Sequence, residues 1–281
     1  MKKIAFCFLI LDSIHHEELW YQFLQNVDTR KYSIYIHYKT NQPLKYFESY
    51  KLKHCIETSW GDLSLVHAQN LLLKEALQDS QNEHFIFVSG SCIPLKHFDT
   101  VYSRLDPSFS YFSDSPQSSC FPRCNHALNY LDKKFIHKSS QWCILNKKHA
   151  TLMLEKPDYL EWFDVVPDEH CYLTNLYVHS LEHELVLTLN TTNVATTFTH
   201  WDDSGLKNYS SISQDELTKL LTKDYLFGRK FNKECDLSHL ELKNPRYELW
   251  LGILMFVVIV LLSLFTLRYL KLKKKVFFQS P

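Results

Sequence analysis

Apolar residues in the first hundred positions occur in short continuous runs, separated by segments in which they recur at helical spacing. Continuous runs are typical of strands covered on both faces. The predicted strands lie at 4–11, 32–37 and 85–89. The predicted helices lie at 17–27, 64–77 and 98–105. Either Asp62 or Ser64 is expected to cap the second helix. This alternation predicts an α/β layered fold with a largely parallel sheet.

Polar residues follow two of the predicted strands. His37 ends the second strand, and Ser89 to Cys92 follow the third. In parallel sheets, ligands bind beyond the carboxyl ends of the strands. His37 is therefore a candidate ligand-binding residue, with an ordinary strand-to-loop turn as the alternative.

A stretch near the C-terminus is apolar and uncharged for about 19 residues, enough to cross a hydrocarbon core. The sequence thus predicts a domain at 1–240, a linker at 241–248, a single transmembrane helix at 249–267 and a basic tail at 268–281. A lipid bilayer is the expected partner of this helix. The basic tail favours a cytosolic C-terminus, which places the domain outside the cell or in a lumen. No cleavable signal peptide is evident, and a tail anchor would leave the domain in the cytosol. Both topologies remain open.

Composition excludes several classes of function. The formal net charge is +0, which does not suit a nucleic-acid-binding surface. The chain has only 5 glycines, and neither a P-loop nor a dinucleotide-binding fingerprint occurs. The 8 cysteines leave the disulfide state open, because a chain of this length folds without crosslinks. Cys120, Cys124 and His126 fit no zinc-binding spacing well, so no metal site is predicted.

One acidic motif suggests chemistry. Pro167, Asp168 and Glu169 stand where a helix is expected to begin. Proline fits the first helical turn, and acidic groups there are stabilised by the helix dipole. One carboxylate can then stay ionised and be aimed as a general base. A capped surface helix without chemistry is the alternative.

Five blocks, in this order, resemble one known family. They lie at 59–77, 85–95, 138–150, 167–170 and 226–231. Together they resemble the core-2/I-branching β-1,6-N-acetylglucosaminyltransferase family, which also includes peptide O-xylosyltransferases. The resemblance covers about residues 4–236. It implies a GT-A type nucleotide-sugar transferase fold, with a Rossmann-like mixed sheet and flanking helices.

The resemblance also implies an inverting reaction. Glu169 matches the family's general base, and Asp168 would orient the loop or cap the helix beside the acceptor. No Asp-x-Asp metal motif occurs, and the family similarly lacks it. Lys230 matches the residue that neutralises the leaving diphosphate, and Arg229 would add a forked contact. No divalent metal or other cofactor is therefore expected beyond the UDP-sugar co-substrate.

The remaining site residues match the family less closely. Lys207 is the nearest basic residue to a family arginine that this chain lacks, and His37 is the further donor-side candidate. On the acceptor side, Trp142 would stack on a sugar or serve as a core aromatic. Arg123 and Trp201 occupy positions where the family has acceptor-binding residues.

The predicted function is transfer of a sugar from UDP-N-acetylglucosamine to a hydroxyl of a glycan or glycoprotein. UDP-xylose is the second choice of donor. The competing hypothesis is a non-catalytic carbohydrate-binding membrane protein that retains the fold.

Overall fold

The computed structural model describes residues 2–115, 119–189, 196–203, 205–242, 244 and 255–267. Its contacts define two units, Met1–Leu240 and Glu241–Pro281. The named helices of the first unit are α1 (Glu17–Leu24), α2 (Leu63–Ala76), α3 (Phe98–Arg104), α4 (Lys147–Glu155), α5 (Cys171–Val178) and α6 (Gln214–Thr222). The strands are β1 (Lys3–Ile10), β2 (Tyr32–Tyr38), β3 (Asn82–Ser89), β4 (Ile93–Pro94), β5 (Ser110–Ser115), β6 (Lys138–Ser139), β7 (Ile144–Asn146), β8 (Leu185–Leu189), β9 (Thr197–Thr199), β10 (Trp201–Asp202), β11 (Gly205–Leu206) and β12 (Phe227–Arg229).

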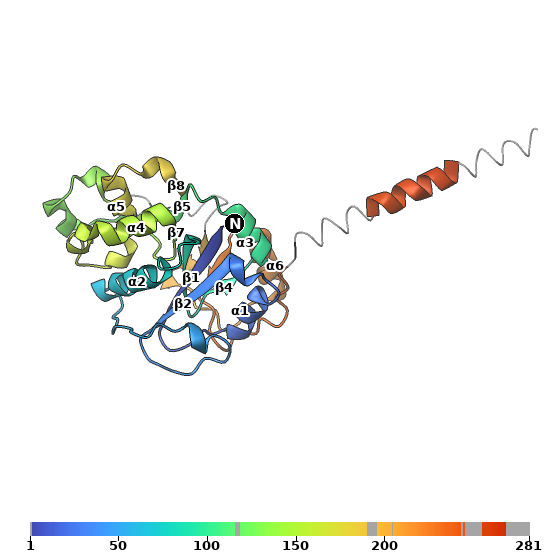
Figure 1. Ribbon diagram of the computed structural model, residues 1–281, viewed down its shortest axis with the longest axis horizontal. Coiled ribbons are helices and arrows are strands. Elements are labelled where there is room, and N and C mark those ends of the chain that lie inside the picture. The colour runs from blue at the N-terminus through green and yellow to red at the C-terminus, as the bar shows by residue number, and fades with distance from the viewer. Residues whose placement is uncertain are drawn as a thin grey trace, which may run out of the picture. The chain divides into compact units, whose positions relative to one another are not determined.

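The main sheet has the order β2-β1-β3-β7-β5-β6, and β8 also pairs with β5 (Figure 1). Strands β2, β1 and β3 are parallel, whereas β7 is antiparallel to both β3 and β5. The fold is therefore mixed α/β. The predicted strands and the layered class are confirmed. The sheet is mixed, because β5 and β8 are also parallel but β6 and β7 add antiparallel pairs. An apolar run carries no information about strand direction, so the sequence pattern did not show these antiparallel pairs.

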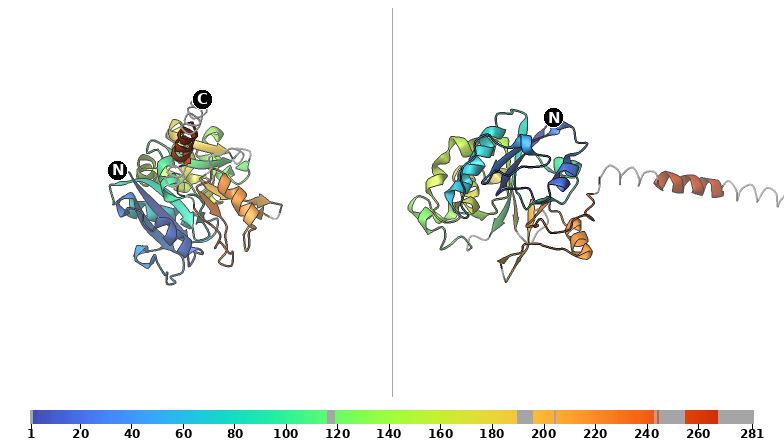
Figure 2. Two further views of the ribbon diagram at one scale, coloured as in Figure 1. Left: turned by 90° about the vertical axis from the view of Figure 1, so that its right-hand side faces the viewer. Right: turned by 90° about the horizontal axis from the view of Figure 1, so that it is seen from below.

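Both faces of the main sheet are covered, as the run at 4–11 predicts. On one face Phe6 and Phe8 contact Trp20 of α1, with ring centroids 5.9 and 4.9 Å apart. On the other face Ala5 and Cys7 belong to a core that also includes buried residues of α2, α4 and α5. Figures 1 and 2 show α2 and α4 on one side of the sheet and α1 and α3 on the other. Apolar side chains pointing both ways place β1 at the centre of three layers.

Two helix ends differ from the prediction in detail. Helix α1 ends at Leu24 rather than at residue 27, because Gln25 is extended and Asn26 has a φ of 71°. Helix α2 begins at Leu63, with the Asp62 carboxylate accepting a hydrogen bond from the Ser64 N–H at 2.8 Å. Of the two candidate caps, Asp62 and Ser64, it is therefore Asp62 that caps the helix.

A second, three-stranded sheet carries the basic segment. Its order is β4-β12-β9, with β12 parallel to β9 and antiparallel to β4. The turn from β3 to β4 requires glycine at position 90, because a Cβ there would lie 2.3 Å from the Ser13 carbonyl oxygen. This turn brings Cys92 close to the end of β12, where Arg229 lies.

The described part of the second unit is a helix at 255–267 together with residues 241, 242 and 244. None of the helices in the described ranges is both long and apolar enough to cross a membrane. Residues 249–254 of the predicted span, and the predicted basic tail, lie outside the described residues. The transmembrane helix is therefore not confirmed.

Candidate active site

The acidic motif forms a tight turn rather than the start of an α-helix. Pro167 to Glu169 make one 3-10 turn, preceded by Val166 in the left-handed conformation at φ 44°. His170 has a φ of −129° and separates this turn from α5, which begins at Cys171. No side chain caps α5. The predicted helix start at Pro167 is therefore wrong, as is the capping role considered for Asp168, because the backbone leaves the helical conformation at His170.

Glu169 is paired with a lysine from the neighbouring sheet edge. Its Oε2 atom lies 3.3 Å from Lys138 Nζ, with the two side chains 29% and 21% exposed. The carboxylate is thus held in place yet reachable from solvent. Lys138 is the first residue of the 138–150 block, but it is not among the predicted site residues. Its place in that block was the sequence feature that could have identified it.

Asp168 lies deeper than Glu169. Its Oδ1 atom is buried without a hydrogen-bond partner among the described residues. Burial, followed by the adjacent Glu169 charge, raises the pKa of Asp168 to about 7, and Arg229 opposes this rise. Two adjacent carboxyl groups are therefore in different environments, and Glu169 is the more accessible of the two.

Arg229 ends β12 and faces these carboxyl groups. Its guanidinium carbon lies 4.5 Å from the centre of the Trp142 ring. Burial lowers the pKa of Arg229, and the charges of Cys92, Asp168 and Glu169 act in the opposite direction. The structure thus brings Arg229 into the electrostatic neighbourhood of the acidic motif.

Lys230 follows Arg229 and is half-buried. Burial, and then the Arg229 charge, lower the pKa of Lys230. Backbone hydrogen bonds fix the segment on both sides of this lysine. The Tyr209 N–H donates to the Lys230 carbonyl at 2.7 Å, and the Phe231 N–H donates to the Ser91 carbonyl at 3.0 Å. A tethered backbone therefore carries two adjacent cations, of which Arg229 faces the acidic motif.

Trp142 is only 7% exposed, and Arg229 lies against its ring. Its carbonyl accepts a hydrogen bond from the Thr196 hydroxyl at 3.0 Å. This burial favours the core-aromatic interpretation over the sugar platform. The ring nevertheless shapes the site, because it supports the guanidinium.

The other predicted residues are more loosely connected to this group. Lys207 Nζ lies 3.3 Å from a Glu216 oxygen and 4.3 Å from the centre of the Tyr209 ring. His37 is fully buried, its Nε2 atom accepts a hydrogen bond from the Ile56 N–H at 3.0 Å, and burial lowers its pKa to about 4. Arg123 is exposed, and its charge acts on His170. Trp201 is 62% exposed on β10. The contacts described for His37 and Trp201 do not reach Glu169.

The structure also gathers residues that the sequence pattern separated. Cys120 and Cys124 lie with His170, and not with His126, whose ring packs on Tyr130. Among the described residues this is the one group of three or more His, Cys, Asp or Glu side chains with metal-binding geometry. Cys120 and Cys124 are close together in sequence, whereas His170 is distant from them and directly follows the acidic motif.

Two surface cavities lie elsewhere in the described part of the chain. One of about 450 Å³ is lined by residues of α1 and by Leu237, and one of about 600 Å³ is lined by residues of α4. Neither is lined by Glu169 or Arg229.

Comparison with known proteins gives a consistent family. Residues 4–221 match the family described as Core-2/I-Branching enzyme. The chain is similar to Glycosyltransferase BC10 of Oryza sativa subsp. japonica, with 27% identity over 242 residues. That match covers 73% of this chain and 59% of the rice protein, so this chain spans less than two thirds of its relative.

A similar solved structure is described as a glycosyltransferase involved in the glycosylation of the major capsid of PBCV-1. The match has 11% identity and a TM-score of 0.37, and it covers 79% of this chain and 92% of that one. This similarity is too weak to establish a shared fold.

Replacing Trp142 with leucine is expected to lower the free energy of unfolding by about 1–3 kcal/mol, because the guanidinium of Arg229 loses its aromatic partner and the core loses volume. Trp60 is 88% exposed and provides the control, since Trp60→Leu should change stability little. Urea unfolding of the full chain measures both. Equal stability of Trp142→Leu and wild type would contradict the packing role.

Proposed function

Because this chain belongs to the core-2/I-branching enzyme family, we propose that it is an inverting glycosyltransferase with the GT-A type of fold. The observation that supports this most directly is the proximity of the Arg229 guanidinium to one accessible carboxylate, Glu169, with Lys230 next to Arg229 in the chain. A base and a cationic leaving-group site are the two parts that sugar transfer to a hydroxyl needs.

In this proposal Glu169 is the general base. Its carboxylate removes the proton of the acceptor hydroxyl as the oxygen attacks the anomeric carbon of the donor. The leaving group departs from the opposite face, so the anomeric configuration inverts, as it does when a base-activated water attacks in inverting glycosidases. The ion pair with Lys138 holds the carboxylate in place.

Arg229 and Lys230 stabilise the leaving diphosphate. The bond between the anomeric carbon and the phosphate oxygen breaks, and its electron pair leaves with the nucleotide diphosphate. A guanidinium forks onto phosphate oxygens, and an ammonium adds a point charge. Together they supply the charge that a divalent ion supplies in other nucleotide-sugar transferases, so no divalent ion takes part in the transfer step.

We propose UDP-N-acetylglucosamine as the donor and a glycan or glycoprotein hydroxyl as the acceptor. The family to which the chain belongs supports this choice. UDP-xylose is the second candidate. A carbohydrate-binding protein without turnover is the alternative function, since this chain has Val194, Ala195 and Thr196 where an arginine is expected.

A panel of UDP-sugars tests the proposed function with the purified full chain. We expect UDP-N-acetylglucosamine to be turned over at least about tenfold faster than the other donors, because a site that hydrogen-bonds the groups of one sugar leaves buried polar atoms unpaired with another. UDP release with and without glycan acceptors is the measurement. Carbohydrate binding without UDP release from any donor would favour the non-catalytic alternative.

Glu169→Gln is expected to lower kcat by about 10²- to 10⁴-fold, the usual contribution of a general base. The Kd for UDP should stay within about twofold, because the amide is isosteric with the carboxyl group and the base does not contact the nucleotide. Glu161, which is exposed at the end of the preceding 3-10 turn, provides the matched control Glu161→Gln. Unchanged kcat in Glu169→Gln would remove this residue from the mechanism.

Lys230→Met is expected to weaken UDP binding by about tenfold or more, because a charge-assisted phosphate contact is lost. Calorimetry in buffer without Mg²⁺ or Mn²⁺ measures the Kd, and Lys223→Met, an exposed lysine just after α6, is the control. Adding either ion should change the wild-type transfer rate less than about twofold. A strict requirement for either ion would contradict the role given to the two cations.

A further inference from the structure

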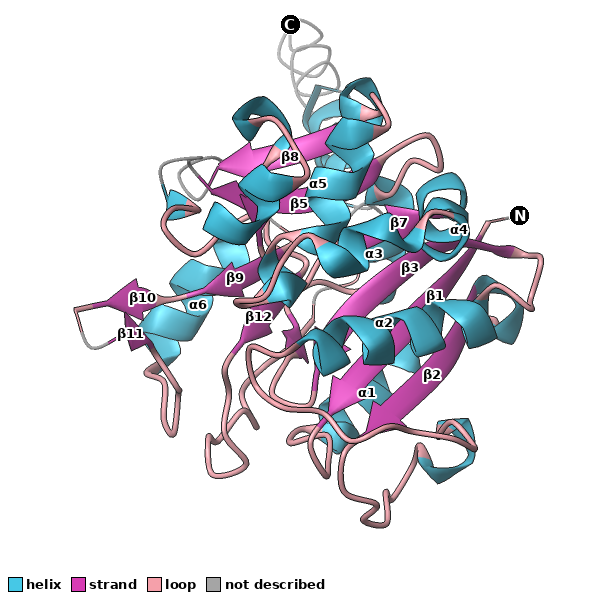
Figure 3. Cartoon of the chain, turned by 90° about the vertical axis from the view of Figure 1, so that its left-hand side faces the viewer, coloured by secondary structure: helices cyan, strands magenta, loops and turns pink. Residues whose placement is uncertain are grey.

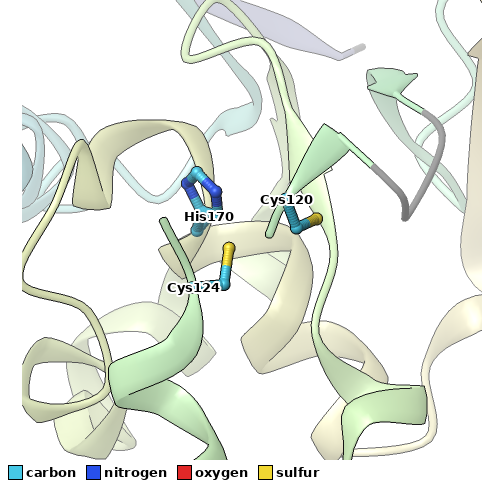
Figure 4. Close-up of side chains that lie close together, drawn as sticks. All are labelled: Cys120, Cys124 and His170. Atoms are coloured by element: carbon cyan, nitrogen blue, oxygen red, sulfur yellow. The ribbon is translucent and has the colours of Figure 1, made fainter. Parts of the chain in front are cut away.

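Three buried side chains beside the acidic motif are arranged as metal ligands. The ligand atoms of Cys120, Cys124 and His170 all lie within 4.8 Å of one another (Figure 4). The exposed fractions of the cysteines are 0%, and that of His170 is 1%. Ligand atoms bound to one tetrahedral zinc ion lie about 3.5–3.8 Å apart, so no pair in this group needs to approach by more than about 1 Å to hold the ion.

The backbone brings the two sulfur atoms to one side of their segment. The Cys124 N–H donates to the Cys120 carbonyl at 3.2 Å, which closes a turn. The two sulfur atoms lie within 4.8 Å of each other across this turn. None of the eight cysteines, all of which the structure describes, is in a disulfide.

The histidine is oriented as a ligand by a hydrogen bond from its other nitrogen. His170 Nδ1 lies 3.0 Å from the Val166 carbonyl oxygen. A carbonyl only accepts, so Nδ1 carries the proton and the lone pair lies on Nε2. That Nε2 atom is buried and has no hydrogen-bond partner among the described residues. Metal-binding histidines typically donate their second ring N–H to a carbonyl or carboxylate in this way.

We propose that Cys120, Cys124 and His170 form a binding site for one structural zinc ion. Thiolate and imidazole are the ligands that zinc prefers, and the fourth tetrahedral position is taken by water or a further group. Binding displaces the two thiol protons to solvent, so the ion and two thiolates together carry no net charge. A neutral cluster suits a buried site better than isolated thiolates do.

A disulfide between Cys120 and Cys124 explains the geometry less well. It would use both sulfur atoms but would leave the buried Nε2 lone pair of His170 without a partner, which is unfavourable. A metal ion satisfies all three groups at once.

The ion would fix the loop that carries the proposed base. His170 directly follows Glu169, and the cysteines lie on a segment that is distant in sequence from it. Coordination would therefore clamp residues 120–124 to the turn at 167–169. This positioning role rests on the proposed function, whereas the metal site does not. The metal site shares no residue with the proposed leaving-group site at Arg229 and Lys230.

Zinc content tests the site directly. The full chain, expressed in zinc-containing medium and purified without chelator, should carry about one zinc per chain by mass spectrometry of the metal. Cys124→Ser and His170→Ala should carry less than about 0.2. Cys55→Ser and His126→Gln are the matched controls and should keep the full content, because neither residue belongs to the group of three.

A second measurement uses only the wild-type protein, so that the test does not depend on the variants folding. Titrating wild-type protein with a mercurial thiol reagent should release the zinc as two thiols react, and peptide mapping should identify them as Cys120 and Cys124. Folded wild-type protein without zinc would overturn the proposal, whether mapping finds these cysteines as thiols or as a disulfide. Full zinc content in both Cys124→Ser and His170→Ala would also overturn it. Zinc content requires no turnover, so a bound zinc with no sugar transfer would contradict only the proposed function.

Discussion

The enclosed positive charge of Arg229 is the interaction on which the candidate site depends. It lies at the end of a strand in the small sheet, with its guanidinium against Trp142 from the segment before β7. Its charge faces the carboxyl groups of Asp168 and Glu169 on a third segment. A cation withdrawn from water is costly unless an aromatic face or an anion compensates it, and here both do. One side chain thus joins the three segments that the proposed chemistry needs.

The surrounding fold makes this arrangement rigid. The segment after β12 is bonded on one side to the turn that follows β3 and on the other to Tyr209. Gly90 permits that turn to approach the chain at Ser13 closely. On another segment of the site, Glu169 is held by Lys138 from β6. Figure 3 shows β12 beside β9 in the small sheet. Side chains that must meet a substrate within fractions of an ångström are therefore placed by sheets rather than by long loops.

The parts of the fold that could be predicted are those whose signal is local. The buried runs at 4–11, 32–37 and 85–89 became strands, and α2 formed where its spacing and Asp62 predict it. Features that arise from distant contacts were missed. The direction of β7 depends on which strand it joins. Glu169 pairs with Lys138, and His170 lies with two cysteines about fifty residues earlier in the chain. Both arrangements depend on which distant segments the fold brings together. His126 lies near the cysteines in sequence and was considered with them, whereas the histidine that lies near them in space is His170.

The central place of β1 has a consequence for synthesis. Strand β1 pairs in parallel with β2 on one edge and with β3 on the other, and β3 ends only at Ser89. An almost entirely apolar strand therefore waits with at least one unpaired edge until some eighty further residues have emerged. At about 5–20 residues per second this lasts several seconds, during which such an edge is prone to join another nascent chain. Strand β1 is accordingly a segment where we expect chaperone dependence during translation.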